Sequence, residues 1–191
     1  MKEVKCFFAA ALVLVLLLAT APGACADVLY PAPAPVQAGS ELNHLVATVS
    51  ADAAISVMEE SIPAGVILSA EPGLEGIDIY LRGVPLYAGS YNCIFSAGET
   101  SLSCPLTVEP AYPFFLSTSS DVFCSMNDPV QLEVSAYAQD NGVLSYQWYL
   151  GQVGSGALIG SDSPTLSVGT STPGTSYYYC VVTNCNNGYT A

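Results

Sequence analysis

Apolar and polar residues alternate along most of the chain beyond about residue 40, in short runs separated by Gly, Pro and Ser. In HLVATVS (44–50), Leu45, Ala47 and Val49 share one face, and GIDIYLRGV (76–84) alternates in the same way. A period of two is typical of half-buried β-strands, whereas an amphipathic helix repeats every 3.6 residues. The pattern therefore predicts an all-β protein built from β-sandwiches.

Proline-rich stretches divide this pattern. EPAYP (109–113) interrupts it with two prolines and predicts a boundary between a domain at 41–109 and a second at 114–191. DVLYPAPAPVQAGS (27–40) alternates Pro with small residues and predicts a polyproline-like spacer before the first domain.

The first 26 residues predict a signal peptide. A basic start, MKEVKC, precedes the apolar run Phe7–Ala21, and small residues at Ala24–Ala26 offer a cleavage site before Asp27. Phe7–Ala21 is shorter than the roughly 20 residues that cross a bilayer, which argues against an uncleaved anchor. A lipoprotein anchored through Cys25 is the weaker alternative, because PGAC lacks the expected aliphatic residue. We expect an exported, extracellular or cell-surface protein with no membrane insertion after cleavage.

The charge of the mature chain limits its ligands. Without Glu3, Lys2 and Lys5, fifteen acidic residues and Arg82 remain, which gives a net charge of −14. A chain with one strong base cannot neutralise phosphates, so nucleic acid is excluded as a partner, and anionic lipid would repel it. The acidity favours a solvated surface that resists aggregation, with calcium binding as an alternative.

Two cysteines lie in a predicted hairpin of the first domain. In CIFSAGETSLSC (93–104), pairing Ser96 with Ser101 across the AGET loop places Cys93 opposite Cys104. Residues opposite one another on antiparallel strands share a face, so we expect a disulfide between them. Cross-links of this kind fit an oxidising compartment outside the cytoplasm.

The first domain contains the segments IPAGVILS (62–69) and IYLRGVPLYAGSYNCIF (79–95). These segments fill the places of the strand motifs of the bacterial cadherin-like Ig repeats, which the domain therefore resembles. The resemblance implies an Ig-like sandwich.

The second domain carries PVQLEVSAYA, GVLSYQWYL and PGTSYYYCVVTNC, with Trp148 and Cys180 on neighbouring strands as in immunoglobulin sandwiches. In these segments it resembles bacterial Ig-like modules of secreted and surface proteins. Val134 occupies the position where the disulfide partner of Cys180 usually stands, so we expect Cys180 to be an unpaired buried thiol. Such modules continue into a final strand, whereas this chain ends at NNGYTA, and we therefore expect a truncated sandwich at the start of a longer polypeptide.

The same resemblance implies a disulfide between Cys124 and Cys185, which would join the start of the second domain to a late turn. A bond between Cys124 and Cys180 is the alternative. Cysteines as metal ligands are disfavoured, because the chain has no CxxC pair and no nearby histidine.

The sequence offers few residues that could act in catalysis. His44 is the only histidine and lies outside every motif, so a Ser–His–Asp or Cys–His site is not expected. Acidic neighbours such as Glu71, Glu75 and Asp78 could form a glycosidase pair, but fifteen acids produce such neighbours by chance. We predict no enzymatic activity, no cofactor and no metal.

Four residues of the second domain predict a binding face. By alternation, Gln147 and Tyr149 on one strand, and Tyr177 and Tyr179 on its neighbour, point away from the core. Tyrosine is favoured on recognition surfaces, although tyrosines also simply pack well on exposed strands. The leading hypothesis is a non-catalytic extracellular interaction or adhesion module of a bacterial surface or secreted protein, with an unknown protein or glycan partner. The alternatives are a passive stalk and the non-catalytic front of a larger secreted hydrolase.

Overall fold

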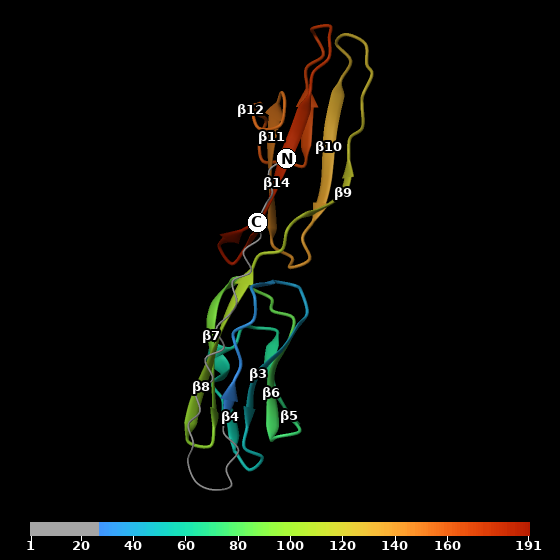
Figure 1. Cartoon of the computed structure of the whole chain (residues 1–191). Coiled ribbons are helices and arrows are strands. Elements are labelled where there is room, and N and C mark those ends of the chain that lie inside the picture. Colours follow the sequence, from blue (N-terminus) through green and yellow to red (C-terminus); the bar gives the residue numbers. More distant parts are fainter. Residues whose placement is uncertain (1–26) are drawn as a thin grey trace, which may run out of the picture.

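The computed structural model describes residues 27–191, so the predicted signal peptide lies outside the described residues. Two Ig-like β-sandwiches follow one another along the chain and lie end to end (Figure 1). The break between them falls between β8, which ends at Glu109, and β9, which begins at Phe114.

The first sandwich packs two four-stranded sheets around one core. One sheet has the order β1-β3-β6-β5, with bounds Val28–Leu29, Leu42–Val49, Ile77–Gly83 and Val66–Pro72. The other has the order β2-β8-β7-β4, with bounds Val36–Gln37, Thr100–Glu109, Gly89–Ala97 and Ile55–Val57. A short 3₁₀ helix, η1, spans Glu59–Ser61.

The core of this sandwich comes from alternate positions of the long strands. Ile79 and Leu81 of β6 are fully buried, as the alternation predicts. In β3, however, the three residues that alternation places on one face are not equally buried, because Leu45 is half-buried while Ala47 and Val49 are buried. A bulge shifts the register between Leu45 and Ala47, so that Val46 and Ala47 are both buried. A bulge places two residues opposite one and breaks the period of two.

The predicted spacer is not a separate segment. Val28 pairs with Thr48 in one sheet, and Val36 pairs in parallel with Val108 in the other, so residues 27–40 form two edge strands of the first sandwich. The prolines at 31, 33 and 35 lie in the crossing between the sheets, where no ladder N–H is needed.

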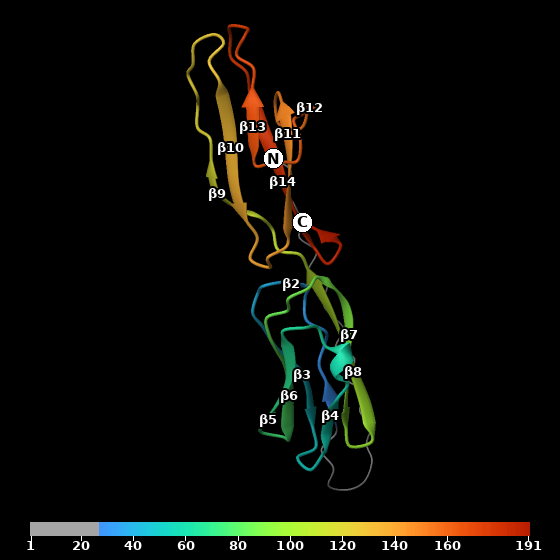
Figure 2. The same cartoon turned by 180° about the vertical axis from the view of Figure 1, so that it is seen from behind.

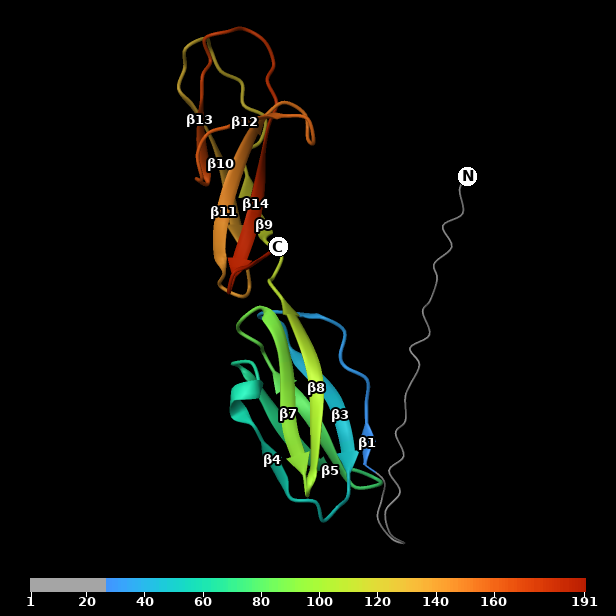
Figure 3. The same cartoon turned by 90° about the vertical axis from the view of Figure 1, so that its left-hand side faces the viewer.

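The second sandwich packs a three-stranded sheet against a four-stranded one (Figures 2 and 3). One sheet has the order β13-β10-β9, with bounds Thr165–Val168, Val130–Tyr137 and Phe114–Thr118. The other has the order β12-β11-β14-β15, with bounds Ala157–Ile159, Val143–Leu150, Tyr178–Asn186 and Tyr189–Thr190.

The last strand, expected to be missing, is represented by the two-residue β15. Asn187 and Gly188 turn the chain with φ of 51° and 82°, a left-handed pair that favours Asn and Gly in tight hairpins. The backbones of Asn184 and Ala191 then exchange two hydrogen bonds of 2.9 Å. The ladder covers only the end of β14.

Candidate interaction surface and the junction between the domains

The four predicted binding residues, here called the tyrosine face, are Gln147, Tyr149, Tyr177 and Tyr179. Tyr149 lies directly opposite Tyr179 on β11 and β14, and their rings stack with centroids 4.7 Å apart and planes 8° apart. Tyr177 is 60 % exposed, and Nε2 of Gln147 donates to the carbonyl of Ile159 at 3.2 Å. The structure therefore brings Tyr149 and Tyr179 into one aromatic pair on the side of the sheet opposite Trp148.

Apolar neighbours extend the tyrosine face across the sheet. Leu158 of β12 stands opposite Tyr149 and is 66 % exposed, while Val181 stands opposite Gln147 and is 45 % exposed. Asp162 is the only charged residue between Asn141 and Ala191, and its carboxylate accepts a hydrogen bond from the N–H of Tyr146. This surface is thus uncharged on a strongly acidic protein.

Cys93 and Cys104 occupy the predicted register. They are directly opposite one another on β7 and β8, as are Ser96 and Ser101, and both cysteines are buried. Burial and the neighbouring Cys104 raise the pKa of the Cys93 thiol to about 11, and burial also raises the pKa of Cys104. All five cysteines among residues 27–191 carry free thiols, so the disulfide between this pair stays a prediction.

The structure does not bring Cys124 and Cys185 together. Cys124 is exposed in the β9–β10 loop, where the N–H of Asn127 bonds the carbonyl of Thr170, at the end remote from the first domain (Figure 1). Cys185 lies at the other end of β14, opposite Val143. The length of β14 separates the two ends of the sandwich, so this geometry disagrees with the expected disulfide between Cys124 and Cys185.

Cys180 lies where the pattern places it. It stands opposite Trp148 and packs in one cluster with Trp148 and Val134. Burial raises the pKa of its thiol, although the residue is only half-buried.

The junction between the domains holds polar side chains that the sequence analysis did not single out. The side chain of Asn186 accepts from the N–H of Ala88 at 2.9 Å and donates to the carbonyl of Leu86 at 3.1 Å. Asn187 donates to the carbonyl of Ala88 at 2.8 Å. Side chains of the β14–β15 hairpin thus bind main-chain N–H and C=O groups of the β6–β7 loop in the first domain.

A second group fixes the linker itself. The carboxylate of Asp140 accepts from the N–H of Ala111 at 3.0 Å, and Asn184 donates to the carbonyl of Ala111 at 2.9 Å. Ala111 and Asn184 are fully buried. Gly39 lies so close to the second domain that a Cβ there would come within 2.8 Å of the carbonyl oxygen of Gln139. The two sandwiches therefore meet through a close, hydrogen-bonded contact.

The alternation of inward and outward residues along β14 already indicated the asparagines of the junction. Tyr178, Cys180 and Val182 face inward, so Asn184 and Asn186 continue the same face with polar side chains. A buried amide needs partners, because an unpaired buried polar group is costly. Two asparagines on an inward face indicate a polar contact beyond the core of their own domain.

Two of the three acidic residues that could form a glycosidase pair, Glu71 and Asp78, have structural partners. Glu71 and Asp78 stand opposite one another on β5 and β6. The hydrogen bond from Arg82 lowers the pKa of Glu71, and Arg82 also lies 4.1 Å from the centre of the Tyr80 ring. Asp78 accepts from the hydroxyl of Thr48 at 2.6 Å. Among residues 27–191, no three His, Cys, Asp or Glu side chains group as metal ligands would.

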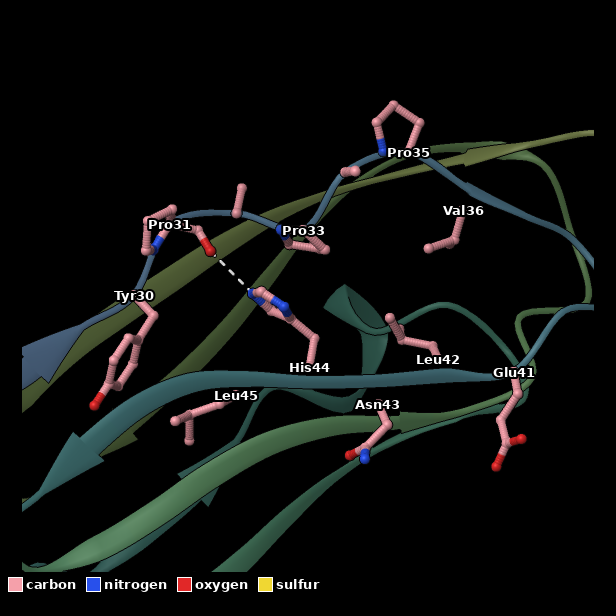
Figure 4. A pocket seen from close by; sticks show the side chains of 12 residues that line it. Tyr30, Pro31, Pro33, Pro35, Val36, Glu41, Leu42, Asn43, His44 and Leu45 are labelled. Carbon is pink, nitrogen blue, oxygen red and sulfur yellow. Dashed lines mark hydrogen bonds between the residues drawn. The ribbon is translucent and has the colours of Figure 1, made fainter. Parts of the chain in front are cut away.

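His44 has a structural contact of its own. Its Nε2 donates to the carbonyl of Pro31 at 2.9 Å and ties the proline-rich crossing to β3 (Figure 4). The groove between the crossing and β3 is lined largely by Pro, Ala and Leu side chains and contains one histidine and one carboxylate, that of Glu41. The contact of His44 holds the crossing against β3.

No protein-family model matches the chain, and no curated protein matches it. Among solved structures, the chain is similar to tandem Ig repeats of Dlar at 17 % identity, covering 86 % of this chain and 90 % of that one with a TM-score of 0.33. It is also similar to titin domains Z1Z2, at 16 % identity, 86 % and 91 % coverage and a TM-score of 0.40.

A third similar structure is the Yersinia pseudotuberculosis adhesin InvE, at 12 % identity, 86 % and 56 % coverage and a TM-score of 0.40. At these identities and scores the likenesses bear no weight for function. Within residues 27–191, none of the helices has the length and apolar character needed to cross a membrane.

Proposed function

We propose that this protein is a non-catalytic, extracellular Ig-like interaction or adhesion module of a bacterial surface or secreted protein. The observation that carries the proposal is the uncharged tyrosine face with its stacked Tyr149–Tyr179 pair. Its partner is a protein or a glycan, and neither cofactor nor metal takes part.

The chemistry of the tyrosine face suits recognition. Tyrosines bury a large area at little entropic cost and offer a hydroxyl for hydrogen bonding. The stack between Tyr149 and Tyr179 holds two rings in place before any partner arrives, which reduces the ordering cost of binding. Exposed Leu158 and Val181 add apolar area that water solvates poorly.

Replacement of Tyr149, Tyr177 and Tyr179 together by Ser tests the proposal. Labelled protein is applied to an array of immobilised glycans and extracellular-matrix proteins, with serum albumin as the blank. Because interface aromatics can each contribute about 2 kcal/mol, we expect the triple variant to lose at least about a hundredfold in affinity for whichever probe the unmodified protein binds.

The matched control replaces three exposed tyrosines elsewhere, Tyr87, Tyr112 and Tyr137, by Ser. This variant should bind as the unmodified protein does. Equal binding by both variants, or no binding of the unmodified protein above the blank, would remove the tyrosine face as a recognition surface.

A passive stalk is the second candidate, and the junction favours it. Asn186, Asn187 and Asp140 hold the two sandwiches together through hydrogen bonds to the loop and linker of the first domain. A fixed junction keeps a following domain at a constant distance from its anchor. The same geometry serves the front of a larger secreted hydrolase, which is the third hypothesis.

A further inference from the structure

The β11–β12 hairpin borders the tyrosine face on one side. Leu158 of β12 lies directly opposite Tyr149 of β11, and residues opposite one another on antiparallel strands share a face. Gly156 lies two residues before Leu158, and a Cβ built on it would come within 3.1 Å of the Cβ of Tyr149. Gly156 therefore faces the same side as the tyrosines, and the outward row of the hairpin has no side chain at this position.

The ring of Tyr179 occupies the space of the missing side chain. A Cβ on Gly156 would lie 2.8 Å from Cε1 of Tyr179, which is closer than the roughly 3.5–4.0 Å that suits two carbon atoms in contact. Tyr179 belongs to β14, and β11 lies between β14 and β12. Its ring therefore leans across β11 and reaches the residue immediately before β12. In this position it stacks on the ring of Tyr149.

The backbone at Gly156 does not itself require glycine. Gly151 and Gly154 of the same hairpin have φ of 119° and 85°, and such left-handed values favour glycine whatever surrounds them. Gly156 does not belong to the residues with positive φ. The contact with the Tyr179 ring is thus the constraint that an added side chain would violate.

The atoms around Gly156 differ in how easily they can move. Besides the Tyr179 ring, an added Cβ would meet the carbonyl oxygen of Leu150 and the Cβ of Tyr149, each at 3.1 Å. These two atoms are fixed to the backbone of β11, whereas the ring can turn about the χ angles of its own side chain. An added methyl group would therefore displace the Tyr179 ring and leave the strands in place.

We propose that Gly156 is a positioning residue of the tyrosine face. Because it has no side chain, Tyr179 can cross β11 and stack on Tyr149, and the aromatic pair is then ordered before a partner binds. This role rests on the proposed function, since it concerns how the recognition surface acquires its shape. It adds the β11–β12 hairpin to the elements that determine binding.

The test compares Gly156→Ala with the matched control Gly169→Ala. Gly169 has no left-handed φ, and a Cβ built on it would meet no atom within 4 Å. In NMR spectra of protein with ¹³C-labelled tyrosine rings, the rings of Tyr149 and Tyr179 should show NOEs to each other and upfield-shifted signals. Gly156→Ala should abolish the NOEs and the upfield shift, and Gly169→Ala should retain both.

Thermal unfolding separates a positioning role from a structural one. The melting temperature should fall by no more than about 3 °C in either variant, because only a ring moves. A much larger fall in Gly156→Ala would assign Gly156 to the stability of the sandwich and would overturn the proposal. Stacking that persists in Gly156→Ala, or that is lost equally in Gly169→Ala, would overturn it as well.

Binding is measured on the array of immobilised glycans and extracellular-matrix proteins. Gly156→Ala should bind about three- to tenfold more weakly than the unmodified protein, because the partner must then order a free ring. In a Tyr149→Ser background the same substitution should cause no further loss, since the aromatic pair is already broken. Equal losses in the two backgrounds would show that Gly156 does not act through the stack.

The NMR comparison and the array fail separately. Unstacked rings in Gly156→Ala, with no binding of the unmodified protein above the blank, would leave Gly156 as the residue that positions Tyr179 and would overturn the proposed recognition function. Persistent stacking in Gly156→Ala, with binding that the triple Ser variant loses, would overturn the role of Gly156 and leave the proposed function in place.

Discussion

The two domains share an architecture but differ in how completely they close. The core of the first contains fourteen buried residues, including Phe95, Ile79 and Leu81. The core of the second has three, Val134, Trp148 and Leu166, surrounded by half-buried neighbours. Both have strands of similar length at the centre, so the difference arises at the edges.

The edge strands of a sandwich decide how completely the inward side chains beside them are buried. In the first domain, Val36 of β2 pairs with Val108, and the long hairpin β7–β8 places Cys93, Phe95 and Leu106 under full cover. In the second, β15 pairs with only the end of β14, and the whole of β9 is exposed. Among residues 27–191, most of β14 has no neighbouring strand on its outer side, and its inward side chains Tyr178, Cys180 and Val182 are only half-buried.

The largest expected effect concerns core truncation. Leu81→Ala, at a fully buried site, should destabilise the first domain by about 3–5 kcal/mol, whereas Leu132→Ala, partly buried in the second, should cost about 1 kcal/mol. Trp148 is the only tryptophan and reports the second domain by fluorescence, while NMR of β6–β8 reports the first. Equal losses would show that the second core is as closed as the first.

The next effect concerns the Cys93–Cys104 pair. Non-reducing peptide mapping of exported protein should find them linked. The bond should stabilise the first domain by about 3 kcal/mol in the chain-entropy model. Cys93→Ala/Cys104→Ala is the control, which reductant should not affect. A disulfide containing Cys180 would show that Val134 is not the substitute for its partner.

With Cys93 and Cys104 reduced, we also expect the free energy of unfolding to depend on pH. The folded state raises the pKa of Cys93 from 9.0 to about 11, so it retains a proton that the unfolded chain loses in between. The free energy of unfolding should therefore fall as pH rises from about 9 to 11, with no contribution from this thiol below that window. Oxidised protein should lack this fall.

The smallest expected effect concerns the junction. Asn186→Ala removes the bonds to Leu86 and Ala88 and should cost about 1–2 kcal/mol. Residual dipolar couplings should fit one alignment tensor for both domains in the unmodified protein and two in the variant. Asn92→Ala, exposed on β7, is the control. A single tensor in the variant would assign the rigidity to the linker rather than to Asn186.

Much of this architecture follows from local patterns. The hairpin register that sets Cys93 opposite Cys104 depends on one loop and a period of two, both visible in the chain. The outward positions of Tyr149 and Tyr179, and the contact of Cys180 with Trp148, follow from the same parity. The prediction of inward and outward faces failed in β3, where the bulge at Val46 adds one residue and breaks the alternation. The bulge depends on packing against other strands.

Alternation and composition were enough to predict the all-β character, the acidity of the chain and the inner and outer faces of the long strands other than β3. These are properties of composition and of a two-residue period. The positions of residues 27–40 as edge strands and of Asn186 against the first domain are visible only in the folded structure. Each depends on which distant segment lies beside a strand, and alternation along one segment contains no information about its neighbour.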